Sequence, residues 1–335
     1  MAAGDGVAVA LVVKDARNPF FTAMQEAARS EAAELGVTLT VAAAAGPTDV
    51  DGQVRAIEDA VRRGDEGILV TPVSDGIDSA LVAAREAGLY VVALDTPTAP
   101  DSGADITFAT DNREAGRLLG AWVAGALEGR DARIAVLDLL GDDSVTVDRD
   151  RNQGFLEGVG IPLGDPSRAG DEVESGTYAN GVGGRYVISC RAASLGSRDG
   201  GAAAMRGCLD ADEEGADPPK PPTVVYAAND AAALGARDAL EEAGIGRALV
   251  VSVDGGCEAV DAVEDGALSA TAQQYPLRMV TLGLRAVAEV SAGGSRPRTS
   301  DGLDFYDTGV ALVTDRPVPG VPSLDVASAR GTCWG

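Results

Sequence analysis

The stretch Val7-Ala-Val-Ala-Leu-Val-Val-Lys-Asp-Ala-Arg-Asn-Pro-Phe-Phe21 contains the first evidence for the fold. Its apolar run, residues 7–13, is typical of a buried strand. An amphipathic helix is predicted from about Pro19 to Leu35, with proline in its first turn and Gly36 as its stop signal. A buried strand that leads through a short loop into a helix indicates a βαβ unit and therefore a parallel sheet.

The same alternation of strands and helices continues along the chain. After the first helix, the pattern predicts a helix near 50–61, a strand at 67–71, a helix at 75–87 and strands at 90–95 and 106–110. A second series begins with a helix at 113–127, capped by Asn112. Its further predicted strands are 133–139, 185–190, 223–227 and 248–253. The predicted helices between and after them are 147–159, 200–210, 230–243 and a long helix at 276–290. The segments 160–184 and 211–222 are predicted loops. We therefore predict an α/β protein with two similarly wound units in tandem.

The composition excludes several classes of function. A length of 335 residues fits about two domains. The formal net charge of −25 argues against nucleic acid and anionic lipid as partners. The chain contains no histidine, which excludes Ser-His-Asp catalysis and histidine-based zinc sites. We therefore expect a binding protein rather than an enzyme, with no cofactor and no metal.

The four cysteines form no C-x-x-C pair. Cys190 ends a predicted strand and Cys208 lies in the next helix, a spacing that could close a local disulfide. Cys257 and Cys333 would then tie the C-terminal end of the chain to the loop after another strand. Two plausible pairings favour an oxidising compartment, and four buried free thiols are the alternative. No apolar run approaches a membrane span, and we expect a mature exported domain without its export segment.

Polar residues follow several predicted strands at their carboxyl ends, where open α/β sheets bind ligands. Asn18, Asp95, Asn229 and Asp254 occupy such positions, and Asp138 lies close to one. Each alone is an ordinary cap or turn residue. Together they indicate a cleft with hydrogen-bonding groups on both walls.

Two further features fit a ligand with hydroxyl edges and an apolar C–H face, as a sugar has. Phe20 and Phe21 supply aromatic faces directly after Asn18. Arg149 and Arg151 lie at a helix start, where the helix dipole disfavours cations. They either pair with neighbouring aspartates or direct a guanidinium at ligand hydroxyls. Gln274 is either a helix cap or a carboxamide aimed at vicinal hydroxyls.

With these positions assembled, the chain resembles the periplasmic sugar-binding proteins of ABC importers, in the ribose/galactose (type I) group and closest to its fructose/ribose branch. The resemblance covers nearly the whole chain. Its motifs, in order, are Asn18-Pro-Phe-Phe21, Ala93-Leu-Asp95, Arg151-Asn-Gln-Gly-Phe155, Tyr226-Ala-Ala-Asn-Asp-Ala-Ala-Ala-Leu-Gly235, Val253-Asp-Gly255 and Ala272-Gln-Gln-Tyr-Pro276.

The resemblance implies two Rossmann-like lobes with parallel sheets, joined by a hinge of three crossings near Asp111, Gln274 and Asp307. The N-terminal lobe would hold residues 1–111 and 275–307, and the C-terminal lobe residues 112–274 and 308–335. A monomer would close its lobes on a monosaccharide and deliver it to an ABC permease, in the periplasm or as a cell-surface lipoprotein. The ligand-binding residues would be Asn18, Phe20, Phe21 and Asp95 from the first lobe, Arg151, Asn229 and Asp254 from the second, and Gln274 at the hinge.

Two departures from the ribose binders bear on the choice of sugar. Those proteins carry an arginine directly after the aspartate, where this chain has Thr96, and an aromatic residue where it has Gly196. The loss of a cation and a ring predicts a larger and more neutral pocket. We therefore expect a larger or furanose sugar such as fructose rather than ribose.

Other functions fit the same pattern less well. A sugar-responsive repressor core needs a helix-turn-helix ahead of Val7, where this sequence has six residues. A nucleotide-using enzyme needs a G-x-G-x-x-G turn after the first strand, where this chain has Phe20 and Phe21. A sensor that hands its ligand to a membrane receptor would share every feature above.

Overall fold

The computed structural model describes residues 6–46, 48–98, 103–141, 145–165, 167–181, 183–215 and 221–335. The chain forms two compact units. Unit 1 comprises Met1–Thr110, Tyr275–Gly309 and Gly335, and unit 2 comprises Asp111–Gln274 and Val310–Trp334. The breaks after 110, 274 and 309 lie beside the three positions at which the resemblance places a hinge.

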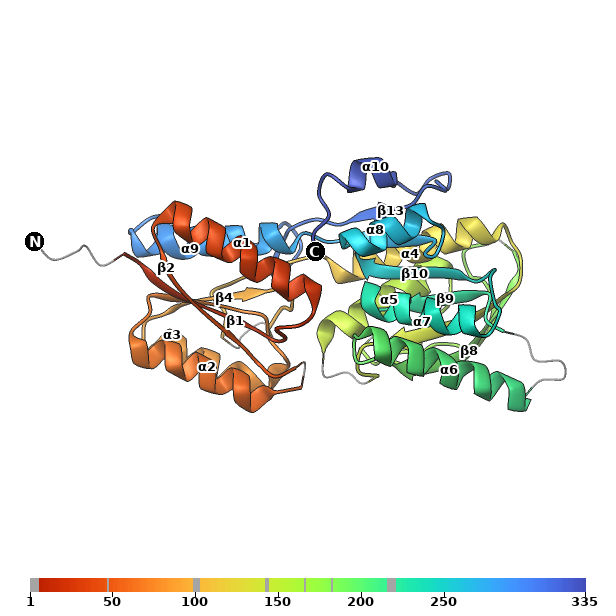
Figure 1. Ribbon diagram of the computed structural model, residues 1–335, viewed down its shortest axis with the longest axis horizontal. Helices are drawn as coiled ribbons and strands as arrows, with labels where there is room; N and C mark the ends of the chain where they lie inside the picture. Colours follow the sequence, from red (N-terminus) through yellow and green to blue (C-terminus); the bar gives the residue numbers. More distant parts are fainter. Residues whose placement is uncertain are drawn as a thin grey trace, which may run out of the picture. The chain divides into compact units, whose positions relative to one another are not determined.

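Unit 1 is a parallel sheet with helices on both faces (Figure 1). Its strand order is β12-β5-β4-β3-β1-β2. The strands are β1 (Ala8–Val13), β2 (Thr38–Ala43), β3 (Gly67–Val70), β4 (Tyr90–Leu94), β5 (Ile106–Ala109) and β12 (Tyr306–Asp307). The helices are α1 (Pro19–Leu35), α2 (Val50–Arg63), the 3-10 turn η1 (Asp75–Ile77), α3 (Asp78–Glu86) and α9 (Pro276–Ser291). Helices α1 and α9 pack together on one face, and α2 and α3 cover the other.

Unit 2 repeats this plan with a longer sheet. Its strand order is β13-β11-β10-β9-β6-β8-β7, parallel except for β13 and β7 at its edges. The strands are β6 (Ala132–Asp138), β7 (Ser175–Thr177), β8 (Arg185–Ala193), β9 (Val224–Ala227), β10 (Leu249–Asp254), β11 (Ala270–Gln273) and β13 (Ala311–Val313). The helices are α4 (Asn112–Leu127), α5 (Thr146–Val159), α6 (Arg198–Gly215), α7 (Asp230–Glu242), α8 (Cys257–Glu264) and α10 (Val326–Ala329). One apolar core lies under α4 and α5, and another lies under α6, α7 and α8.

The predicted fold class, two doubly wound α/β units with mainly parallel sheets, is confirmed. The structure also contains strands that the apolar pattern did not reveal. β2 is an edge strand whose residues are exposed or half-buried, so its sequence lacks an apolar run. β11 is fully buried, but two of its four residues are Thr271 and Gln273. Short β7 lies inside the predicted loop 160–184.

Some predicted boundaries are wrong. The cap of α4 is Asp111, whose Oδ1 accepts the Glu114 N–H at 2.9 Å, and Asn112 is the first helical residue. β8 extends to Ala193 because its later residues pair with the end of β6. α6 extends to Gly215, into the predicted loop 211–222, of which residues 216–220 lie outside the described residues.

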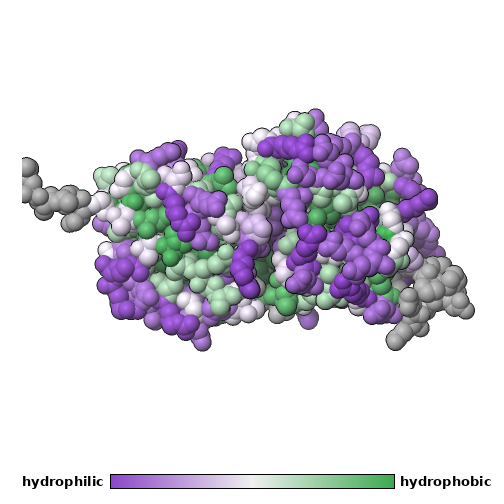
Figure 2. All heavy atoms as spheres, viewed as in Figure 1, coloured by the Kyte–Doolittle hydropathy of each residue, from purple (hydrophilic) through white to green (hydrophobic). Residues whose placement is uncertain are grey.

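Both expected disulfides are present. Cys190–Cys208 joins β8 to α6, and Cys257–Cys333 joins α8 to the end of the chain. None of the described helices combines the length and apolar composition needed to cross a membrane. On the face drawn in Figure 2, hydrophilic side chains are spread over much of the surface, with smaller apolar patches between them.

Four glycines allow α4 and α5 to approach closely. Each is spaced by four residues from another, so each helix presents two glycines on one face. A Cβ on any of them would overlap backbone atoms of the other helix. These glycines are Gly116 and Gly120 in α4 and Gly154 and Gly158 in α5.

We predict that Gly154→Ala lowers the free energy of unfolding by about 3 kcal/mol, because the methyl group must displace the backbone of Arg113. Urea unfolding measures this change. Gly207→Ala is the matched control, since its Cβ would meet nothing within 4 Å on an exposed face of α6. That control should be neutral or stabilise the protein by up to about 1 kcal/mol. Equal effects of the two substitutions would contradict the close packing of α4 on α5.

Candidate ligand-binding site

In unit 1, the start of α1 presents an amide and two aromatic rings beyond the end of β1. Asn18 is the N-cap of α1, and its Oδ1 accepts the Phe20 N–H at 2.9 Å. The rings of Phe20 and Phe21 meet edge to face with centroids 5.1 Å apart. Pro19 fixes the first helical position between them and the cap. The cap therefore orients the rings that the sequence singled out.

Asp95 directly follows β4 and is buried, with 4% of its surface exposed. Lys14, directly after β1, places its Nζ 3.0 Å from Asp95 Oδ2 and donates to Thr96 Oγ1 at 2.8 Å. The Thr96 hydroxyl in turn donates to Asp95 Oδ2 at 3.0 Å. The ammonium also lies 5.4 Å from the centre of the Phe21 ring. A cation, a carboxylate and a hydroxyl thus form one cluster at the carboxyl edge of this sheet, beside an aromatic ring.

This cluster corrects one sequence-based expectation. The absence of a cation after Asp95 predicted a more neutral pocket, but Lys14 brings a cation to the same carboxylate from another strand. The rule that selected Asn18 and Asp95 also applies to Lys14, because it follows a buried strand directly. Lys14 was missed because a lone lysine in a polar loop is usually exposed.

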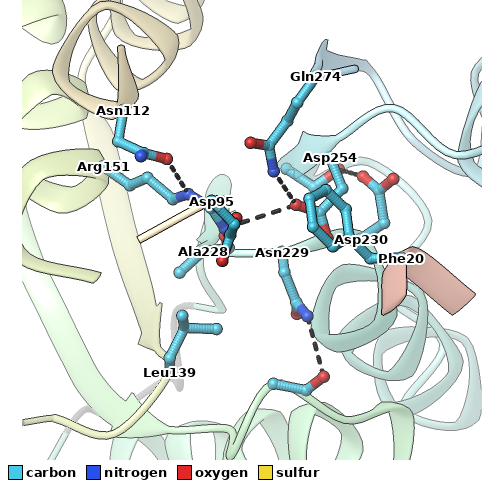
Figure 3. Close-up of polar contacts among 12 residues, drawn as sticks. Phe20, Asp95, Asn112, Leu139, Arg151, Ala228, Asn229, Asp230, Asp254 and Gln274 are labelled. Carbon is cyan, nitrogen blue, oxygen red and sulfur yellow. Dashed lines mark hydrogen bonds and ion pairs between the residues drawn. The ribbon is translucent and has the colours of Figure 1, made fainter. Parts of the chain in front are cut away.

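In unit 2, three predicted residues belong to one hydrogen-bonded network (Figure 3). Arg151 in α5 is buried, and its guanidinium donates to Asn112 Oδ1 at 2.7 Å and to the Ala228 carbonyl at 2.8 Å. Its Nη1 lies 3.5 Å from Oδ1 of Asp254, the last residue of β10. Gln274 donates from Nε2 to the same Asp254 oxygen at 2.6 Å.

The two arginines at the start of α5 have different roles. Arg149 pairs with the neighbouring Asp150 at 3.3 Å, as the surface ion-pair alternative predicted. Arg151 points into the unit and meets Asp254. The two arginines lie two residues apart on the helix and therefore face different directions.

Asn229 caps α7, with its Oδ1 accepting the Ala232 N–H at 3.0 Å, and its Nδ2 donates to the Gly196 carbonyl at 2.9 Å. The cap interpretation of this residue is therefore correct. Its side chain also ties the loop after β8 to the end of β9. The next residue, Asp230, is buried and accepts from the hydroxyls of Ser252 and Thr271 and from the Gly256 N–H. Sequence reasoning missed Asp230, which fixes the turn that follows Asp254.

Backbone strain marks several of these positions. The described non-glycine residues with positive φ are Asp95 (67°), Asp254 (128°), Leu195 (54°) and Glu128 (51°). Glu128 ends a helix, but the other three follow or end strands at the carboxyl edges of the two sheets. Strained backbone gathers at functional sites, so this distribution supports a ligand site at these edges.

Asp138, at the end of β6, belongs to a different buried cluster. Its Oδ1 accepts from Arg191 and from Asn152, each at 2.7 Å. Burial raises the pKa of the Asp138 carboxyl to about 6. Among the described residues, no group of three or more His, Cys, Asp and Glu side chains is arranged to hold a metal ion.

We predict that ionisation of the buried Asp138 carboxyl lowers the free energy of unfolding as the pH rises from about 4 to about 6. The pKa of the Asp138 carboxyl in the folded protein lies above the usual 3.8. The stability that its protonated form contributes is therefore fully present below pH 3.8 and is lost as the pH rises through about 6. The free energy of unfolding of Asp138→Asn minus that of the wild type should therefore rise by about 2 kcal/mol from pH 4 to pH 7. Urea unfolding across this range measures it.

Asp49→Asn is the control. The Asp49 side chain accepts hydrogen bonds from backbone N–H groups, which lower its pKa. The difference in the free energy of unfolding between Asp49→Asn and the wild type should therefore change little above pH 5. Parallel profiles for Asp138→Asn and the wild type would show that the burial of Asp138 does not shift its titration.

Comparison with known proteins places the chain in a family. The family described as "Periplasmic binding protein domain" matches residues 9–295. The ribose import binding protein of Salmonella typhimurium is 28% identical over 287 residues, 85% of each chain. The galactofuranose-binding protein of Escherichia coli is 27% identical over 276 residues, 81% of this chain and 77% of that protein.

Solved structures agree with this placement. An ABC transporter solute binding protein from Mycobacterium smegmatis, with bound glycerol, is 28% identical, with a TM-score of 0.75 over 98% of this chain and 99% of that one. The crystal structure of a galactofuranose binding protein shares the fold at 23% identity, with a TM-score of 0.77 over 97% of each chain. With two doubly wound units and a family match over most of its length, the chain belongs to the periplasmic binding protein family.

Proposed function

We propose that this protein is the extracytoplasmic solute-binding component of an ABC importer and that it captures a monosaccharide. One observation carries the proposal. Each unit holds a buried carboxylate with strained backbone at the carboxyl edge of its sheet, and each carboxylate has a buried cation beside it. These pairs are Asp95 with Lys14 in unit 1 and Asp254 with Arg151 in unit 2.

The chemistry of these pairs suits an uncharged polyol. A carboxylate accepts hydrogen bonds from two hydroxyls, while guanidinium and ammonium groups donate to hydroxyl oxygens. Since each carboxylate is accompanied by a cation, neither pair calls for a charged ligand. The rings of Phe20 and Phe21 would cover the apolar C–H face of a sugar. Asn18, Asn229 and Gln274 would complete its set of amide partners.

Capture would use a hinge closure. The chain passes between the units after residues 110, 274 and 309, and Gln274 is the last residue before one of these passages. A sugar that contacts both units would favour their closed state over the open one, and the closed form would be presented to the permease.

We infer that the sugar is a furanose or a larger monosaccharide, with fructose preferred to ribose. Gly196 carries no side chain, so this position supplies no aromatic ring beside Asn229. Relatives named for furanose ligands include the galactofuranose-binding protein and a Shewanella arabinose-transporter component bound to L-arabinofuranose, 26% identical with a TM-score of 0.72 over 87% of this chain. Because Lys14 places a cation beside Asp95, the preference for fructose is inferred from the missing ring at Gly196 and not from a neutral pocket.

The surroundings proposed for this function follow from other features. Two disulfides suit an oxidising, extracytoplasmic compartment. A net charge of −25 disfavours nucleic acid as a partner. We propose that the protein works as a monomer, with a permease as its protein partner.

Calorimetric titration with D-fructose, D-ribose, D-allose, D-galactose and L-arabinose tests the proposal. We expect at least one of these sugars to bind. Arg151→Met should weaken the affinity for that sugar by tenfold or more, about 1.4 kcal/mol. Arg149→Met is the matched control and should change the affinity by less than twofold, because Arg149 pairs only with its neighbour among the contacts described. No binding by the wild type, or equal losses in both variants, would rule out this site.

A second prediction concerns Lys14. Lys14→Met and Asp95→Asn should each weaken sugar binding by tenfold or more, because each removes one half of the buried pair. The double variant should lose much less than the sum of the two losses, since the partners act as a unit. Calorimetry on the four proteins of this cycle measures the coupling. Strictly additive losses would show that Lys14 does not act through Asp95.

A further inference from the structure

The last residues of unit 2 pack against the two turns that carry Asp254 and Gln274. We call residues 329–334 the C-terminal segment. Its Cys333 is bonded to Cys257, three residues after Asp254. The Cys257 N–H donates to the Trp334 carbonyl at 2.9 Å. The Trp334 indole donates to the Gln274 carbonyl at 3.0 Å. One short segment therefore contacts both chain stretches that supply proposed sugar ligands.

Gln273 adds buried hydrogen bonds between the C-terminal segment and the turn after β10. Its side chain is fully buried, and its Nε2 donates to the carbonyls of Gly255 at 3.0 Å and Ala329 at 3.3 Å. Its Oε1 accepts from the Thr332 hydroxyl at 2.8 Å. The carboxamide thus joins the turn after β10, the end of β11 and the C-terminal segment. None of these three can shift without breaking a buried hydrogen bond.

The turn after β10 has little freedom of its own. Asp254 and Gly255 both have positive φ, and a Cβ at Gly255 would overlap the Gln273 backbone. The Gln274 N–H donates to the Asp254 carbonyl at 2.9 Å. Gln274 Oε1 is buried without a partner among the described atoms, so the carboxamide itself is not fully held by hydrogen bonds. The backbone contacts from Asp254 and Trp334 therefore carry much of the positioning of Gln274.

We propose that the C-terminal segment is a positioning element of the ligand site and that sugar affinity depends on the Cys257–Cys333 bond. Trp334 is its main positioning residue, because it joins the disulfide-bonded end of the chain to the backbone of Gln274. This inference rests on the proposed sugar-binding function. It assigns a role in binding to residues that lie outside the set expected to contact the sugar.

The second disulfide provides a matched control within the same unit. Cys190–Cys208 joins β8 to α6, and in the sheet β10, β9 and β6 lie between β8 and β11. Neither of its cysteines forms a described hydrogen bond to the turns at 254–257 or 273–274. Loss of either disulfide removes a covalent link from unit 2, but only one link holds the C-terminal segment.

The test compares C257S/C333S with C190S/C208S by calorimetry with D-fructose, D-ribose and D-allose. We expect C257S/C333S to weaken the affinity for the sugar that the wild type binds by tenfold or more. C190S/C208S should change this affinity by less than twofold. Trp334→Phe retains both disulfides and an aromatic ring but loses the indole N–H, and we expect at least a threefold loss of sugar affinity. If C257S/C333S does not fold, Trp334→Phe decides the question alone. Wild-type affinity in Trp334→Phe, or equal losses in both serine variants, would overturn the proposal.

A readout without sugar separates this proposal from the proposed function. Hydrogen exchange measured on the free protein should speed up at residues 254–257 and 273–274 in C257S/C333S and in Trp334→Phe, while exchange in α4 and α5 stays as in the wild type. If no sugar binds the wild type, the proposed function fails, and the exchange data still test the positioning by the C-terminal segment. Unchanged exchange at both turns would overturn it.

Discussion

A buried carboxylate must be compensated by a cation or by hydrogen-bond donors, and a cation beside the carboxylate organises both candidate ligand faces. Removing such a charge from water without a partner costs several kcal/mol. Asp95 and Asp254 lie at strand ends in strained backbone, where they are nearly hidden from solvent. Lys14 and Arg151 supply the compensating charges from other elements of the same unit. The folding of each unit therefore assembles a polar site as part of its own stability.

The surrounding structure holds these groups in place by close backbone packing. In unit 2, reciprocal glycines bring α4 against α5, which sets Asn112 of α4 within hydrogen-bond distance of Arg151. Asp230 holds the turn after Asp254 through Gly256. The C-terminal segment holds the next strand end at Gln274. Rigid placement of this kind lowers the conformational cost of binding a small polar ligand.

The alternation of apolar runs and helical spacing was enough to predict the fold class, because parallel strands buried on both faces have continuous apolar sequences. It could not reveal β2, whose residues are exposed or half-buried, or β11, in which two of the four buried residues are polar. Strand ends identified Asn18, Asp95, Asn229 and Asp254 as candidates. Lys14 was missed because its burial depends on Asp95, 81 residues away, and no local pattern reports that pairing. The contacts of Asn112 with Arg151 and of Trp334 with Gln274 likewise depend on tertiary packing.

Sugar binding at these carboxylate–cation pairs is tested most directly by native mass spectrometry of the protein, first as purified and then after addition of a mixture of D-fructose, D-ribose, D-allose, D-galactose and L-arabinose. We expect a mass increase equal to one monosaccharide per chain, and the same experiment on Arg151→Met should show much less of this adduct. An absence of any sugar adduct in both samples, or a co-purifying ligand of another class such as an amino acid or a nucleotide, would contradict the claim that these carboxylate–cation pairs bind a sugar.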